Sequence, residues 1–164
     1  TDSLLSGPPG VGAVITIAPH RDIEISRELI AGSVATVARF SAMSGKAVSG
    51  ARAADTEEIE AVSRSYDMRK HGQGRSTQAD GLSDDFIDRF AITGPPDACI
   101  LRLESLLGLG LSHLSLVPPG PDRAGRDRDE SIALLNTEVL PAIRALIAAR
   151  SAEPHRAHGV GVSQ

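Results

Sequence analysis

Aromatic residues and cysteine are scarce in this sequence. Phe, Tyr and Trp together make up 2% of its 164 residues, and Trp is absent. A core of ordinary size must therefore be built from Leu, Ile, Val and Ala. The single cysteine, Cys99, excludes an internal disulfide and fits a reducing cytoplasm. We expect Cys99 to be a small buried hydrophobe on the inner face of a helix.

An excess of positive charge and a long apolar run are also missing. The net charge is −4, so little is available to neutralise a phosphate backbone, and nucleic acid is a poor candidate partner. The apolar runs are too short to span a bilayer, and the start has no charged-then-apolar signal segment. With 41% hydrophobic and 23% charged residues, the composition is typical of a soluble domain with a real core, and we expect a cytoplasmic protein.

Three short apolar segments alternate with longer helical patterns. The segments cover residues 12–19, 90–93 and 112–117, and each ends at Gly or Pro. After the first segment, apolar residues recur at helical spacing, which predicts a long helix. Asp55 and Glu58 resemble a capping box at the start of another helix. Ser83 can cap a short helix. A further helix follows Pro96, and a last one runs over about 130–149, where Pro141 is expected to bend or split it. This alternation predicts an α/β fold with parallel strands.

A parallel sheet of three strands would have two open edges. Strands that are apolar on both faces seldom lie exposed, and open edges invite pairing with other chains. The sequence therefore indicates that these segments form only part of a larger sheet.

The order of several motifs resembles the luciferase-like monooxygenases. Tyr66-Asp67 is followed by His71-Gly72, then by an acidic helix that ends in IDRF, and then by AITGPPD, RLESLLGLGLSHLSL and EVLPAI. The resemblance covers residues 11–148. It is strongest to the branch of coenzyme F-420-dependent reductases and dehydrogenases that includes methylenetetrahydromethanopterin reductase.

This resemblance implies a fold and an activity. The family has a (β/α)8 TIM barrel of roughly twice this length, so the chain would supply strands six to eight with their helices. Residues 1–149 would belong to the barrel and 150–164 would be a flexible tail. The implied activity is oxidoreductase or monooxygenase chemistry, with hydride transfer between reduced F-420, or alternatively FMN, and a small organic substrate. The family's catalytic residues lie mostly in the first half, so none is assigned here.

Arg89 is the first candidate for a substrate contact. The resemblance implies this role, since the sugar-phosphate dehydrogenases that the chain resembles have an arginine at this place that holds the anionic group of the substrate. A guanidinium can bind such a group with two parallel donors. The alternative is a surface arginine that ends a short helix and pairs with Asp85 or Asp88. Barrel sites lie at the C-terminal ends of strands, whereas Arg89 precedes its strand.

Tyr66, His71 and Arg75 form a second set of candidate substrate contacts, together with Asp67. They fall in the long connection between the first two apolar segments, which in the resembling family covers the mouth of the barrel. The alternative is that Tyr66 anchors a helix face and His71 caps a helix end.

Gly94, Pro95 and Gly120 are the candidate cofactor contacts. They follow the second and third apolar segments, where a helix N-terminus offers free N–H groups to an anion. The alternative is ordinary turn chemistry, and proline, which has no N–H, makes a poor phosphate cradle.

We expect no metal site, since His155 and His158 lack further ligands at suitable spacing. The alternative to an enzyme is a non-catalytic half-barrel, which covers its sheet edges by forming a homo-oligomer or by pairing with a missing N-terminal half.

Overall fold

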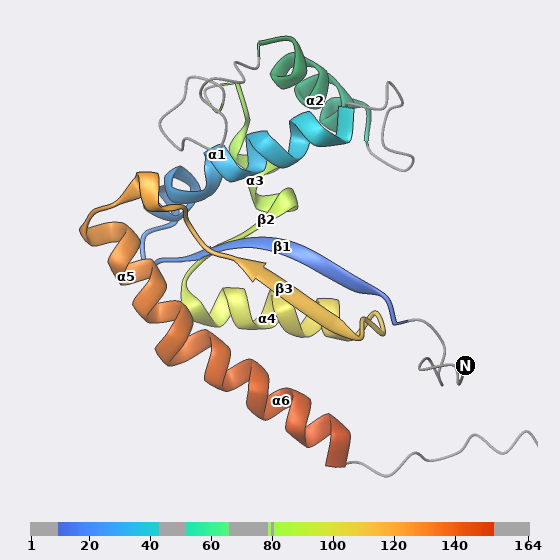
Figure 1. Cartoon of the computed structure of the whole chain (residues 1–164), viewed down its shortest axis with the longest axis vertical. Coiled ribbons are helices and arrows are strands. Elements are labelled where there is room, and N and C mark those ends of the chain that lie inside the picture. Colours follow the sequence, from blue (N-terminus) through green and yellow to red (C-terminus); the bar gives the residue numbers. More distant parts are fainter. Residues whose placement is uncertain (1–9, 43–51, 66–78, 80, 153–164) are drawn as a thin grey trace, which may run out of the picture.

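In the computed structural model, residues 10–42, 52–65, 79 and 81–152 are described. Strands β1 (Gly12–Pro19), β2 (Ala91–Gly94) and β3 (His113–Val117) alternate with helices (Figure 1). The helices are α1 (Ile23–Ala42), α2 (Ala53–Ser65), α3 (Asp84–Phe90), α4 (Pro96–Leu107), α5 (Arg126–Leu134) and α6 (Leu140–Ala152). A 3-10 turn, η2 (Pro121–Arg123), precedes α5, and a π-helical segment, η3 (Leu135–Val139), joins α5 to α6.

The sheet is parallel, and its strand order is β2-β1-β3. Pro19 of β1 pairs with Gly94 of β2, and Ile15 of β1 pairs with Leu116 of β3. The α/β class, the parallel direction and the three strand positions predicted from the sequence are confirmed, with shifts of one residue at both ends of β2 and at the start of β3.

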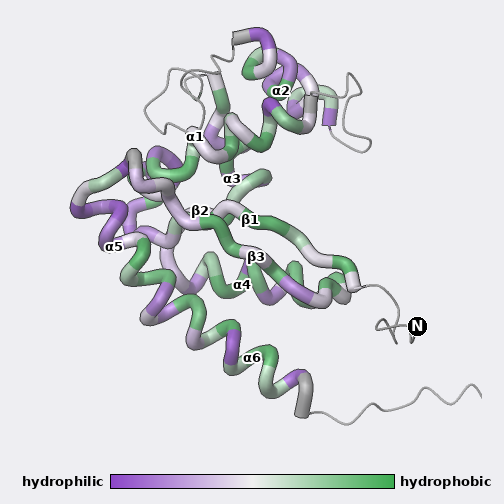
Figure 2. The backbone as a smooth tube through the Cα atoms, in the orientation of Figure 1, coloured by the Kyte–Doolittle hydropathy of each residue, from purple (hydrophilic) through white to green (hydrophobic). Residues whose placement is uncertain are grey.

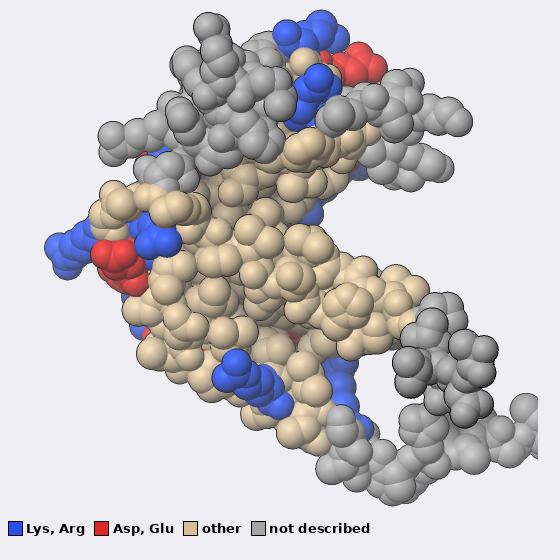
Figure 3. Space-filling view, in the orientation of Figure 1, with Lys and Arg blue, Asp and Glu red and all other residues tan. Residues whose placement is uncertain are grey.

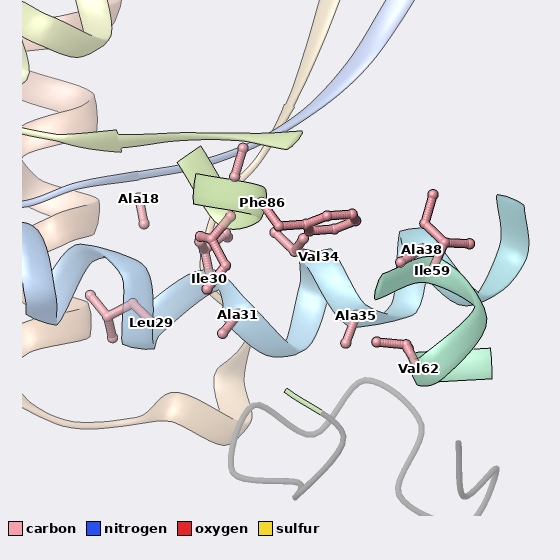
Figure 4. Close-up of a cluster of buried hydrophobic side chains, with 12 residues drawn as sticks. Ala18, Leu29, Ile30, Ala31, Val34, Ala35, Ala38, Ile59, Val62 and Phe86 are labelled. Carbon is pink, nitrogen blue, oxygen red and sulfur yellow. The ribbon is translucent and has the colours of Figure 1, made fainter. Parts of the chain in front are cut away.

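Helices cover both faces of this sheet. Ala18 packs with α1, α2 and α3 in one hydrophobic cluster, whereas its neighbour Ile17 packs with α4 and the α5–α6 helix in another. Figure 1 shows α1, α2 and α3 on one side of the strands and α4 and α6 on the other. Figure 4 shows the first cluster, in which Phe86 of α3 lies against Val34 of α1. Because successive side chains of a strand alternate between faces, the apolar run of β1 serves both clusters.

The layering differs from three neighbouring strands of a barrel wall. In a (β/α)8 barrel the helices form one outer ring and each strand lies beside the next along the chain. Here β3 pairs with β1 instead of β2, and α1 covers the opposite face from α4. The side chains give a physical reason, since β1 is buried on both faces at its C-terminal half. In β3, only Leu114 and Leu116 join a cluster, which suits an edge position.

Side-chain hydrogen bonds mark the N-terminal ends of helices α3 and α2. Ser83 caps α3 as predicted, because its side-chain oxygen accepts the N–H of Phe86 at 3.1 Å. The predicted cap at Asp55 is wrong, since α2 begins two residues earlier. The Asp55 carboxylate, at the third position of the helix, instead accepts the backbone N–H of Arg52 at 3.3 Å, as the N3 residue of a capping box does.

Pro141 neither splits nor ends the last helix. Residues Arg126–Arg150 form one continuous helix, and the wider π-helical turn η3 directly precedes α6. Proline cannot donate a backbone hydrogen bond and crowds the carbonyl four residues earlier, so a wider turn there relieves the conflict. The helix extends through Ala152, past the predicted boundary at 149, and a tail over 153–164 lies outside the described residues.

This helix is long and apolar enough to cross a membrane by length and composition alone, which the separate apolar runs of the sequence did not indicate. Figure 2 shows that polar residues concentrate at its start and that apolar and polar residues alternate further along. Its apolar side chains Leu135, Val139 and Ile143 belong to the second hydrophobic cluster. Packing on the sheet therefore accounts for part of its apolar composition.

Candidate functional site at the C-terminal edge of the sheet

The carboxyl ends of the three parallel strands meet at one edge of the sheet. His20 directly follows β1, Gly94 is the last residue of β2, and Pro118 follows β3. In open α/β sheets, ligands bind beside this edge. We therefore take the residues at this edge as the candidate functional site.

Gly94 holds β1 and β2 together at this edge. Its φ of +100° lies in the region that favours glycine, and its carbonyl accepts the N–H of His20 at 2.9 Å and the Sγ–H of Cys99 at 3.5 Å. Its own N–H donates to the Ser26 hydroxyl at 2.8 Å, and that hydroxyl donates to the Ala18 carbonyl at 2.5 Å. Both the N–H and the carbonyl group of Gly94 are thus hydrogen-bonded within the protein. A bound molecule could therefore contact Gly94 only by van der Waals packing.

The helix that follows Gly94 is a weak anion site. Pro95 is the N-cap of α4, Pro96 is its first residue, and neither has an N–H to donate. Asp97 adds a negative charge to the same first turn. Cys99, deeper in α4, is fully buried as predicted, and burial raises the pKa of its thiol to about 12. It is therefore an inert part of the core.

The loop after β3 is fixed by an arginine. The Arg128 Nε donates to the carbonyl oxygens of Pro119 and Gly120 at 3.2 Å and 2.9 Å. A cavity of about 180 Å³ lies between this loop and α1. Two acidic and two basic residues are among those that line it: Glu28, Asp127, Arg123 and Arg128. Its size and mixed charge suit water or a small polar group rather than a large aromatic ring.

His20 is a buried residue at this edge that sequence reasoning missed. It is 5% exposed, and its Nδ1 lies 3.1 Å from both the N–H and the carbonyl oxygen of Asp22. Its Nε2 is buried without a partner among the described residues, 3.9 Å from the Glu130 carboxylate. Its place directly after the strand over 12–19 is the signal that could have identified it. A histidine and a carboxylate at this spacing could exchange a proton through one bridging water molecule.

Arg89 lies away from this edge, at the end of α3 before β2 begins. Its two terminal nitrogens pair with Asp55 of α2 and with Asp85 of its own helix. The pairing with Asp85 was the alternative expected from the sequence. The Asp55 carboxylate is buried, so this ion pair joins α2 to α3. A substrate contact by Arg89 stays a prediction, and it would require these partners to be exchanged.

The other predicted substrate residues cannot be placed beside these. Tyr66, Asp67, His71 and Arg75 lie outside the described residues. Of the predicted sites, the structure brings together Gly94 and Pro95 at the same edge as Gly120, while Arg89 lies at the opposite end of β2.

A second ionic group that the sequence did not indicate joins α1 to α3. The Arg27 guanidinium donates to Asp88 at 2.7 Å and 3.1 Å and to Asp84 at 3.0 Å. The Thr93 hydroxyl donates to the same Asp88 carboxylate at 2.7 Å. The hydrogen bond from Arg27 lowers the pKa of Asp88. This group fixes the entry into β2.

A larger apolar groove lies on the other side of the sheet, between α4, β3 and α6. We call it the α4–β3–α6 groove, and its volume is about 770 Å³. Leucine and isoleucine side chains make up most of its lining, with His113, Arg144 and Arg150 among the polar residues. Figure 3 shows basic side chains in the region of α6 and few charges on the face over the strands. Its lining is far more apolar than the cavity beside Arg128.

Comparison with known proteins identifies similar chains. No family model matches this sequence. The 5,10-methylenetetrahydromethanopterin reductase of Methanopyrus kandleri is 33% identical over 88 residues, which are 53% of this chain and 23% of the reductase. A solved structure of the coenzyme F-420-dependent tetrahydromethanopterin reductase of that organism superposes with a TM-score of 0.55 at 24% identity. That match covers 80% of this chain and 35% of the solved one.

These matches confirm the resemblance that the motifs predicted and support the α/β fold. The chain spans only between 23% and 35% of the length of the relatives that it matches.

Proposed function

We propose that this chain is the C-terminal part of a coenzyme F-420-dependent oxidoreductase. The observation that carries the proposal is the 33% identity over 88 residues to a reductase, and a solved reductase structure superposes on 80% of this chain with a TM-score of 0.55. The chemistry would be hydride transfer between the reduced cofactor and a carbon atom of a small organic substrate. Such chemistry belongs to the cofactor, and the protein positions the reactants and excludes water.

The described residues do not by themselves form a complete binding site for this cofactor. The peptide groups of Gly94 and the carbonyl of Gly120 are already hydrogen-bonded within the chain, and Pro95 has no N–H. The cavity at this edge, about 180 Å³, is smaller than a cofactor pocket. The proposal therefore assigns to Gly94, Pro95 and Gly120 a packing role at the rim. The donors for the phosphate group of the cofactor would come from other parts of the complete protein.

We further propose that β1, β2 and β3 take the places of strands six to eight in the complete barrel. Their parallel direction and their connection through helices support this placement. In a barrel β3 would lie beside β2. We therefore expect β3 to pair with β1 only in residues 1–164 by themselves, and not in the complete barrel.

Titration with F-420 and with FMN tests the cofactor assignment. We expect the natural gene product, read from its own start codon, to quench F-420 fluorescence at micromolar concentrations and to bind FMN more weakly. Residues 1–164 alone should bind neither tightly, because the described edge lacks phosphate donors. Absence of F-420 binding by both proteins would reject the assignment.

The second candidate function is a non-catalytic half-barrel. The open edge of β3 and the α4–β3–α6 groove favour it, since both are surfaces that a protein partner could cover. A folded natural gene product that binds neither cofactor and forms a stable assembly would support this alternative.

A further inference from the structure

We propose that Glu130 exchanges a proton with the substrate at the C-terminal edge of the sheet, and that His20 behind it is a positioning residue that takes up and returns this proton. The inference rests on the proposed oxidoreductase function and deepens it by naming the kind of substrate. It is built from the burial of His20, from the backbone contacts that hold its ring and from the exposure of Glu130.

The imidazole ring of His20 has one nitrogen atom without a partner. His20 directly follows β1 and is 5% exposed, and its Nε2 is buried without a hydrogen bond among the described residues. Buried polar atoms are nearly always paired, so an unpaired one calls for a reason, and use in a reaction is one such reason. The Glu130 carboxylate lies 3.9 Å from this atom. That distance is too long for a direct hydrogen bond and suits one bridging water molecule.

The backbone of Asp22 holds the ring in each of its protonation states. The Nδ1 of His20 lies 3.1 Å from the Asp22 carbonyl oxygen, which can accept an Nδ1 proton. It also lies 3.1 Å from the Asp22 N–H, which can donate to an Nδ1 that carries no proton. Asp22 is fixed in turn at the start of α1, because its carboxylate accepts the N–H of Glu24 at 2.9 Å. The ring can therefore gain or lose a proton, as histidine readily does near neutral pH, and stay beside Glu130.

Glu130 is the exposed member of the pair. Its side chain is 40% exposed, against 7% for His20, and within the described part of the chain no other ion pair or hydrogen bond involves its carboxylate. Other charged groups at this edge have partners, since Arg21 pairs with Glu138 at 2.8 Å and Arg128 donates to the carbonyl oxygens of the loop after β3. Further charged residues line the small cavity between that loop and α1: Glu28, Arg123 and Asp127. Glu130 is thus the carboxylate at this edge that is available to a bound molecule.

The proposed step moves protons only. In the direction of reduction, the O–H bond of the Glu130 carboxyl group breaks and an O–H bond forms on the oxygen atom of the substrate. The resulting carboxylate then takes the Nε2 proton of the His20 imidazolium through the bridging water, and a proton from solvent restores the pair. In the direction of oxidation each transfer runs backwards. The substrate is therefore a compound with a carbonyl or hydroxyl group at the carbon atom that exchanges the hydride.

Proton exchange at the His20 ring tests the pair without cofactor or substrate. In residues 1–164 labelled with ¹⁵N-histidine, we expect Glu130→Gln to slow exchange of the Nε2 proton with water by roughly 10-fold or more, because an amide does not relay protons as a carboxylate does. Glu138→Gln is the matched control. Its side chain is 41% exposed in the same continuous helix, but it pairs with Arg21, so exchange should equal that of the wild type. Equal exchange rates in all three proteins, measured by magnetic resonance, would overturn the proposal.

Turnover by the natural gene product tests the substrate class. With reduced F-420 and a panel of aldehydes and ketones, Glu130→Gln should lower kcat by about 100-fold with KM and F-420 fluorescence quenching unchanged. His20→Asn, which keeps an amide near the backbone of Asp22 but removes Nε2, should also lower kcat and leave KM unchanged. Glu138→Gln should behave as the wild type.

Two turnover results would overturn the proposal: a wild type that binds F-420 but reduces none of the carbonyl compounds, or an unchanged kcat for Glu130→Gln. A wild type that binds no F-420 would reject the proposed function, and the substrate class with it. The exchange measurement on residues 1–164 still decides whether His20 and Glu130 share a proton, so the two failures are distinguishable.

Discussion

At the scale of single residues, Ser26 links β1 to β2 at the C-terminal edge of the sheet. Its hydroxyl is buried and bridges the Ala18 carbonyl to the Gly94 N–H. Ser26→Ala would leave both backbone groups buried without this partner. We expect a loss of about 1–3 kcal/mol in the free energy of unfolding, measured by urea denaturation.

Ser41→Ala provides the control for this change in the same helix. The Ser41 hydroxyl donates only to the Val37 carbonyl, one turn earlier in α1, and no strand depends on it. The control should change stability by less than about 0.5 kcal/mol. Equal losses for the two variants would contradict the role given to Ser26.

Arg89 can be tested for a structural role and a substrate role separately. Arg89→Ala leaves the Asp55 carboxylate buried without its main partner, and we expect a loss of about 2–3 kcal/mol. Adding Asp55→Asn should recover part of that loss, because the unpaired charge is removed. Urea denaturation of the two single variants and the double variant measures this coupling.

The double variant then tests the substrate contact. If Arg89 binds an anionic substrate group, a folded Arg89→Ala/Asp55→Asn version of the natural gene product should lose affinity for that substrate. Unchanged substrate affinity together with recovered stability would leave Arg89 with the ion-pair role alone.

At the scale of elements, the contact between α1 and α3 should depend on pH. The Arg27 guanidinium lowers the pKa of Asp88 below its ordinary value of 3.8. A group whose pKa is lowered on folding stabilises the protein above its unfolded pKa, and this stability is lost as pH falls through the folded pKa. Asp88→Asn should therefore cost about 1 kcal/mol near neutral pH, a modest value because the carboxylate is partly exposed.

The comparison of wild type and Asp88→Asn across pH measures this effect. The stability difference should stay constant down to about pH 4 and shrink below that value. A difference that persists unchanged to pH 2 would contradict the proposed coupling between Arg27 and Asp88.

The sequence predicted the elements better than their arrangement. Alternating apolar segments and Gly or Pro ends located all three strands, because burial and turn chemistry are local signals. The order β2-β1-β3 could not be read in this way, since it depends on which strand is apolar on both faces and on how the helices pack. The split that was one expected effect of Pro141 is absent for a related reason, because the preceding turn η3 widens and accommodates the proline within a continuous helix.

The candidate site was predictable only in part. Gly94 and Gly120 were identified from the ends of their strands, and both lie at the C-terminal edge. The hydrogen bonds that occupy their backbone groups come from Ser26, which is distant in sequence, and from Arg128, which lies at the start of α5 in a charged stretch with no motif. His20 escaped notice because a single histidine after a strand has no distinctive pattern until its burial is known.

At the scale of the whole molecule, the central claim is that these three parallel strands belong to a larger barrel. Cross-strand NOEs in the natural gene product, read from its own start codon and isotopically labelled, test it most directly. We predict contacts between β3 and β2, the order of consecutive barrel strands, whereas residues 1–164 alone should show the contact between Ile15 and Leu116. A natural gene product that keeps β3 beside β1, with no β3–β2 contacts, would contradict the account.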